Sequence, residues 1–163
     1  MKIIGVVILL IVILLWGNVY VSSIKPTTHV IPAPTITPTP TPIILNSSKL
    51  FDLINKYRVN NGLSSLVWNN SMCPFSNKRL EEIHTHYSHE GYLSNPHPYD
   101  TNQDSTGENL LQGFDSEETA VQAWINSPEH KKNILDNHFS QTCISTDTYN
   151  NHTFAVQEFA SDF

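Results

Sequence analysis

The fold of this chain is decided by four short motifs between Tyr87 and Gln141: Tyr87-Ser88-His89, Gly107-Glu108-Asn109, Trp124-Ile125-Asn126-Ser127-Pro128-Glu129-His130 and Asn137-His138-Phe139-Ser140-Gln141. Each motif contributes an imidazole or a carboxylate near the end of an expected secondary-structure element. When a fold gathers such side chains, they form a polar cleft that can hold a metal ion, a water molecule or an anionic group. We therefore expect these residues to meet in space.

Hydrophobic periodicity and capping residues around these motifs predict an α+β domain, with helices first and strands last. Ser47 or Ser48 caps a first helix that stops at Asn61-Gly62, and Ser116 caps a third. The other expected elements are a second helix from about Met72 to Tyr87, a loop over Glu90–Thr106, a short helix from Pro128 to about Leu135, strands Cys143–Thr148 and Thr153–Ala160, and a hairpin turn at Tyr149–His152.

The ordered motifs resemble the CAP superfamily, also called SCP-like domains (cysteine-rich secretory proteins, antigen 5 and pathogenesis-related proteins), and in particular its bacterial-type secreted branch. The resemblance runs from about Lys49 to Phe163. It implies an α-β-α sandwich, in which a small central antiparallel sheet lies between helical layers. Members of the family have been linked to lipid or sterol binding, defence and extracellular signalling, so the resemblance defines the fold better than the ligand.

The resemblance also implies a ligand-binding cleft of two histidines and two glutamates. His89 and Glu108 match the first histidine and the acid of the Gly-Glu-Asn motif. Ser127 stands where the second acid is expected, so one carboxylate is missing. Two residues match the second histidine: His130 in a Ser-Pro-x-His pattern, and His138 in a His-Phe-Ser-Gln pattern. His130 ranks slightly first, because its helix follows the tryptophan helix directly.

Imidazoles combined with a carboxylate can bind a divalent cation such as zinc and leave one position open for water. His89, His130 and His138 are the candidate metal ligands. The alternative is architectural: Glu108 fixes loop amides, and each histidine is a satisfied polar residue at an element end. We assign no catalytic residue, because no nearby serine lies in an arrangement that activates a hydroxyl.

These observations favour an extracellular binding or interaction module whose ligand is a lipid, a cell-wall component or a protein. The alternative is a metal-dependent hydrolase of peptide or cell-wall material, in which Glu108 would act as base toward metal-activated water. Nucleic acid is not an expected partner. The net charge is −6, and no basic run exceeds Lys131-Lys132.

The first 23 residues predict export. Lys2 precedes an apolar stretch that extends to Val21, and about 19 such residues nearly cross a hydrocarbon layer of about 30 Å. This length favours an uncleaved transmembrane anchor with the domain outside the cell membrane. The alternative is a signal peptide cut near Val21-Ser22-Ser23, which would release a secreted protein.

Residues 24–45 are rich in proline and threonine and predict an extended linker between the anchor and a domain at 46–163. The domain contains the two cysteines of the chain, Cys73 and Cys143. An even cysteine count in an exported protein indicates a disulfide, and the resemblance places both residues in the packed core. Two buried free thiols are the alternative.

Overall fold

The computed structural model describes residues 43–95 and 106–161. The predicted anchor at 1–23 lies outside these ranges, and so do residues 24–42 of the predicted linker. Within the described ranges, no helix combines the length and the apolar character that a membrane crossing requires.

A four-stranded sheet forms the centre of the domain, in the order β1 (Val67–Trp68), β3 (Gln141–Tyr149), β4 (His152–Ala160) and β2 (Thr106–Gln112). The pairs β3/β4 and β4/β2 are antiparallel, as expected. The edge strand β1 instead runs parallel to β3, so the sheet is mixed. β1 lies in the stretch between α1 and α2, where no strand is predicted.

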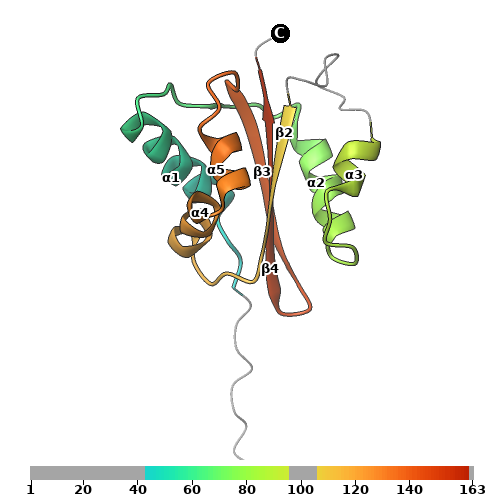
Figure 1. The fold of residues 1–163 in the computed structure, drawn as a ribbon. Coiled ribbons are helices and arrows are strands. Elements are labelled where there is room, and N and C mark those ends of the chain that lie inside the picture. The colour runs from blue at the N-terminus through green and yellow to red at the C-terminus, as the bar shows by residue number, and fades with distance from the viewer. Residues whose placement is uncertain (1–42, 96–105, 162–163) are drawn as a thin grey trace, which may run out of the picture. The chain divides into compact units, whose positions relative to one another are not determined.

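Helices cover both faces of this sheet (Figure 1). On one side lie α1 (Ser47–Asn60), α4 (Glu117–Asn126) and α5 (Pro128–Ile134), and on the other lie α2 (Cys73–Ile83) and α3 (Glu90–Ser94). The larger core cluster contains residues of α1, α4 and the sheet, among them Ile54, Trp124 and Phe159. The arrangement is α+β with three layers.

The hairpin and most helix ends agree with the sequence-based predictions. Ser116 accepts a hydrogen bond from the Thr119 amide at the start of α4, and the β3–β4 turn places Asn150 and Asn151 at positive φ, as a tight hairpin of this type requires. The predicted cap of α1 is wrong. Asn46, rather than Ser47 or Ser48, accepts from the Lys49 amide.

Three local features differ from the prediction. The second helix ends at Ile83 instead of Tyr87, and the Thr85 and His86 amides fold back to the Glu82 carbonyl. A short helix, α3, lies within the expected loop. Leu45, assigned to the linker, is buried in the core at 2 % exposure, and its carbonyl accepts from the Thr146 hydroxyl.

The predicted disulfide between Cys73 and Cys143 is confirmed. It joins the first residue of α2 to the third residue of β3, and both lie beside Met72 and Phe75 in a second core cluster. One helical layer is thereby covalently tied to the sheet.

Candidate functional site

The site centres on an ion pair between Arg79 of α2 and Glu108 of β2. Arg79 Nε donates to Glu108 Oε2 at 2.7 Å, and Arg79 Nη2 donates to Oε1 at 3.3 Å. Both side chains are only 1 % exposed. Because buried charges are costly unless they are paired and hydrogen-bonded, the two residues depend on each other.

His89 extends this pair toward solvent. Its Nδ1 lies 2.7 Å from Glu108 Oε1, and its side chain is 49 % exposed. His89 is also the N-cap residue of α3. A buried carboxylate therefore orients an accessible imidazole, in the way that hydrogen bonds to one ring nitrogen fix the role of the other.

Arg79 also holds the backbone beside His89. Its Nη2 donates to the Ser88 carbonyl at 2.7 Å, and its Nη1 contacts Glu82 Oε2. The guanidinium therefore fixes both the residue that precedes His89 and the carboxylate that His89 contacts. Because this fork presents several donors in one plane, a single arginine can do both.

His130 of α5 belongs to the same neighbourhood. Burial lowers the pKa of His130, and its electrostatic interaction with the nearby His89 lowers it further. Amide side chains connect α5 to β2: Asn109 Nδ2 donates to the His130 carbonyl at 3.2 Å, and Asn133 Nδ2 donates to the Glu108 carbonyl at 3.1 Å. His130 therefore favours its neutral form close to His89.

His138 is placed elsewhere. Its side chain is 82 % exposed, and its Nδ1 lies 2.8 Å from Asp136 Oδ1 in the loop after α5. The structure therefore brings together His89, Glu108 and His130, while the contacts of His138 are local. Ser127, at the position of the missing acid, is the N-cap residue of α5.

These residues do not fit a catalytic metal site. Both Glu108 oxygens are occupied by Arg79 or His89, and the guanidinium charge beside them disfavours a cation. The remaining imidazoles of His89 and His130 are fewer than the three protein ligands typical of catalytic zinc. In the parts of the chain that the structure describes, no group of three or more His, Cys, Asp or Glu side chains is arranged to hold a metal ion.

Sequence reasoning missed Arg79 as a site residue. It lies on the buried face of α2 with Phe75 and Ile83. A charged residue in the middle of an apolar stripe is itself a signal, because it requires a buried partner of opposite charge.

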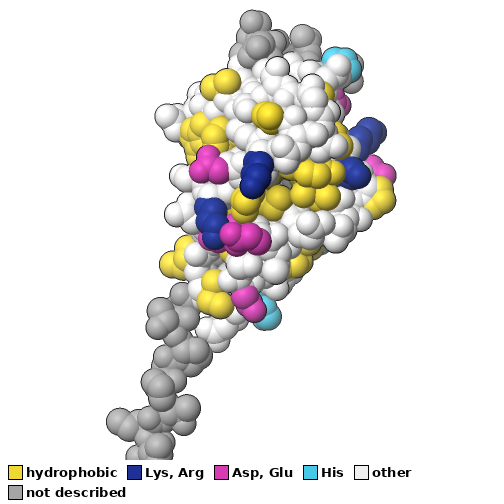
Figure 2. Space-filling view, turned by 90° about the vertical axis from the view of Figure 1, so that its left-hand side faces the viewer, with side chains coloured by type: hydrophobic (Ala, Val, Ile, Leu, Met, Phe, Trp, Pro, Cys, Tyr) yellow, Lys and Arg dark blue, Asp and Glu magenta, His cyan; other side chains and the backbone are white. Residues whose placement is uncertain are grey.

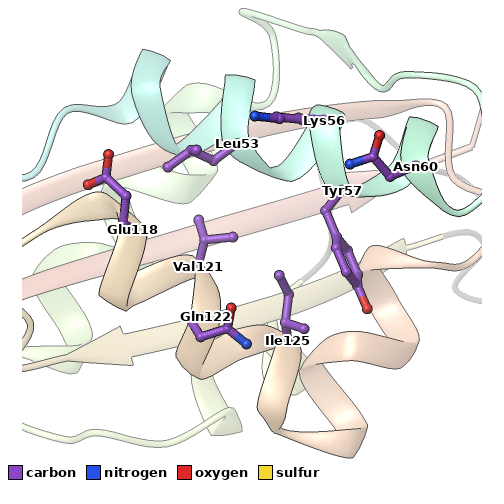
Figure 3. A pocket seen from close by; sticks show the side chains of 8 residues that line it. All are labelled: Leu53, Lys56, Tyr57, Asn60, Glu118, Val121, Gln122 and Ile125. Carbon is purple, nitrogen blue, oxygen red and sulfur yellow. The ribbon is translucent and has the colours of Figure 1, made fainter.

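A concavity lies away from these histidines, between α1 and α4. It is a groove of about 250 Å³ lined by Leu53, Lys56, Tyr57, Asn60, Glu118, Val121, Gln122 and Ile125. α1 and α4 each contribute four of these side chains. Leu53, Val121 and Ile125 lie between the two helices (Figure 3). On this side of the domain, apolar side chains lie among basic and acidic ones (Figure 2).

Comparisons with known proteins agree with this architecture. An outer surface protein of Borrelia burgdorferi superposes with a TM-score of 0.64 at 19 % identity, covering 76 % of this chain and 100 % of that one. A cysteine-rich secretory protein of Staphylococcus aureus gives 0.59 at 17 % identity, and an extracellular SCP-domain protein of Bacillus anthracis gives 0.56 at 22 %. Each of these two matches covers 71 % of this chain but only 38 % and 40 %, respectively, of the solved chain.

Curated protein sequences yield no match. The model of the cysteine-rich secretory protein family, CAP, matches residues 51–159. This range contains all four histidine and glutamate motifs and both cysteines. The chain therefore belongs to the CAP family.

Proposed function

We propose that this CAP domain is exported and held at the outer face of the cell membrane by its N-terminal segment, where it acts as a recognition module. The ligand would bind at the side-chain cluster of His89, Glu108 and His130. One observation carries the proposal: a buried Arg79–Glu108 pair holds a half-exposed imidazole in a fixed position. The similar proteins described as outer-surface or extracellular support an external location.

The groups at this cluster suit a ligand with an anionic or hydrogen-bond-accepting group. Burial raises the pKa of Tyr87, and the nearby Glu108 carboxylate raises it further, so the phenol keeps its donor proton at neutral pH. Tyr87 is 48 % exposed. A half-exposed phenol and an oriented imidazole can each donate a hydrogen bond to such a group.

The geometry supports recognition better than hydrolysis. A general base needs a free acceptor atom toward the reacting water, yet each Glu108 oxygen accepts from Arg79 and one also meets His89. The carboxylate is therefore used to hold its neighbours rather than to accept a proton from substrate.

Binding is tested with the full chain purified in mild detergent, using soluble peptidoglycan fragments and mixed micelles of phosphatidylglycerol as probes. We expect His89→Ala to weaken binding about tenfold or more, because a hydrogen bond to a charged group is lost. His138→Ala is the matched control and should bind like the parent chain. Stoichiometric zinc, together with peptide or cell-wall turnover that Glu108→Gln abolishes, would establish the hydrolase instead.

The tether is tested separately, by the mass of the protein recovered from the membrane fraction of cells. An intact N-terminus beginning at Met1 or Lys2 supports an anchor. A protein that starts after Ser23 and accumulates in the medium contradicts the anchor and leaves export in place.

The groove between α1 and α4 supports a second candidate, the binding of an alkyl chain. Lys56 of α1 and Glu118 of α4 line it together with the apolar side chains, so an amphipathic ligand could bury its chain and keep its head group near these charges. The fluorescent fatty acid cis-parinaric acid is a suitable probe. Leu53→Trp should fill the groove and abolish the fluorescence increase, whereas Val59→Trp, at a residue of α1 that is 55 % exposed, should not. Equal effects of the two variants would argue against binding in the groove.

A further inference from the structure

Another concavity lies at the opposite edge of the sheet from the cluster of His89, Glu108 and His130. It has a volume of about 480 Å³ and is lined by Arg58, Gly62, Leu63, Ser64, Ser65, Val67, Asn137, Phe139 and Ser140. Val67 belongs to β1, which is the edge strand opposite β2. Neither that cluster nor the groove between α1 and α4 involves Arg58 or Ser140.

Arg58 gives this cavity a buried positive charge. Arg58 is 2 % exposed and continues the buried stripe of α1 that contains Leu50 and Ile54. The side chain donates to four main-chain carbonyls, those of Ser64, Ile134, Asp136 and Phe139. Within the described ranges, no carboxylate lies within ion-pair distance of Arg58.

One N–H donor of the Arg58 guanidinium is not used by these four carbonyls. An arginine carries five N–H groups; Nε and Nη2 each make one of the four bonds and Nη1 makes two. The second Nη2 proton therefore has no hydrogen bond in the described part of the chain. Burial lowers the pKa of Arg58, although the charge of Asp136 acts in the opposite direction.

Ser140 supplies a second donor at the wall of the same cavity. Its Oγ is buried and has no hydrogen-bond partner among the described residues. Most buried polar atoms of native proteins are hydrogen-bonded, so a buried hydroxyl without a partner beside a cavity calls for an explanation. Leu63, Val67 and Phe139 supply apolar surface to the cavity.

We propose that this cavity binds a carboxylate attached to a small aliphatic group. The two carboxylate oxygens would accept from the free Nη2 proton of Arg58 and from the Ser140 hydroxyl, and the aliphatic part would lie against Leu63, Val67 and Phe139. A carboxylate complements a buried cation that main-chain carbonyls solvate but do not neutralise. A free organic acid and the C-terminus of a peptide both present this chemistry.

The test is a titration of the full chain in detergent with small ligands. Binding is monitored through the NMR signals of the Arg58 side chain and the Ser140 amide. Isovalerate represents a free acid, N-acetyl-leucine represents a peptide C-terminus, and isovaleramide is the neutral control. Ligands of this size bind in about the millimolar range. We expect the acids to bind at least tenfold more tightly than the amide. Tighter binding of N-acetyl-leucine than of isovalerate would identify a peptide C-terminus, and the reverse order a free acid.

Two variants probe the site while keeping the four carbonyl bonds of Arg58. Ser140→Ala should weaken binding of the acids about tenfold, because a donor to a charged group is lost. Val67→Asp places a carboxylate at the rim, where Val67 is 64 % exposed, and should also weaken it. The matched controls Ser48→Ala and Val59→Asp, both at exposed positions of α1, should leave affinity unchanged.

The proposal is overturned if the amide binds as tightly as the acids, or if no probe shifts these signals. It is also overturned if Ser140→Ala binds like the parent chain. These outcomes are independent of the proposed function, because the binding of peptidoglycan and phosphatidylglycerol is tested through His89, at the opposite edge of the sheet.

Discussion

At the scale of single residues, the domain is defined by two arginines that lie where aliphatic side chains are expected. Arg58 follows Leu50 and Ile54 on the buried face of α1, and Arg79 lies between Phe75 and Ile83 on that of α2. The surroundings satisfy the two charges differently. Arg79 meets carboxylates, whereas Arg58 meets main-chain carbonyls. Each arginine marks a place where the core contains polar chemistry.

Arg79→Met tests the buried pair. The variant would leave the Glu108 carboxylate buried without its counterion, so the free energy of unfolding should fall by about 3–5 kcal/mol. Urea denaturation measures this change. Lys78→Met, at the exposed neighbouring residue of α2, is the matched control and should change stability by no more than about 0.5 kcal/mol.

The double variant Arg79→Met/Glu108→Gln separates the pair from general packing. It should lose less stability than the sum of the two single variants, because neither partner is left charged and alone. Strict additivity, or an Arg79→Met variant as stable as the control, would contradict an energetically coupled pair.

His130 gives the domain a pH-dependent contribution to stability. Burial and the electrostatic interaction with His89 lower its pKa in the folded state, whereas an unfolded histidine titrates at about 6.5. The unfolded state therefore binds more protons just below that pH. The contribution is fully present above about pH 6.5 and is lost as the pH falls from there through the folded pKa.

Unfolding free energies measured between pH 8 and pH 5 check this sign. His130→Gln should flatten the decline on acidification, and His138→Gln should keep it. The folded state also lowers the pKa of three carboxyl groups, those of Glu117, Glu118 and Asp136. Their contributions to stability are lost at a lower pH than that of His130. An unchanged slope in His130→Gln would show that another group titrates.

At the scale of elements, capping rules predict the starts of α4 and α5, but the strand that carries Glu108 is not predicted. Ser116 and Pro128 mark α4 and α5 because capping and φ restriction act within one turn. The strand β2 was not assigned from the sequence. Its residues from Gly107 to Leu111 are all buried, so Glu108 and Asn109 interrupt the alternation that identifies a strand.

Gly91 decides how α3 docks against α2. A Cβ atom there would clash with Arg79 Nη1 and Glu82 Oε2. Arg79 cannot easily move away, because it also holds Glu108 and the Ser88 carbonyl. Glycine is therefore required where α3 approaches the ion pair.

Gly91→Ala should displace α3 and with it His89. We expect a loss of about 1–3 kcal/mol in unfolding free energy, the usual cost of overpacking, and a shifted NMR signal of the His89 ring. Ser94→Ala in the same short helix is the control. If Gly91→Ala leaves both the stability and the His89 signal unchanged, α3 does not depend on this close approach.

At the scale of the whole domain, the order of motifs predicts the layers, but contacts between distant residues complete the site. His89 and Glu108 are identified by their motifs, whereas Arg79 joins them through pairing across 29 residues of sequence. Likewise, His130 and His138 match their patterns almost equally well. Only the position of α5 against β2 separates them, through the amide bonds of Asn109 and Asn133.

The disulfide holds these layers together and gives the last prediction. It closes a loop between residues 70 apart, so in the chain-entropy description its removal lowers the free energy of unfolding by about 4 kcal/mol. The native fold should persist at 25 °C, because Met72, Phe75 and Ala160 still pack around Cys143. Urea denaturation of the full chain with and without reductant measures the difference. The variant Cys73→Ala/Cys143→Ala should match the reduced protein and no longer respond to reductant. Two alkylatable thiols in protein purified without reductant, or equal stability in both conditions, would show that the bridge does not stabilise the domain.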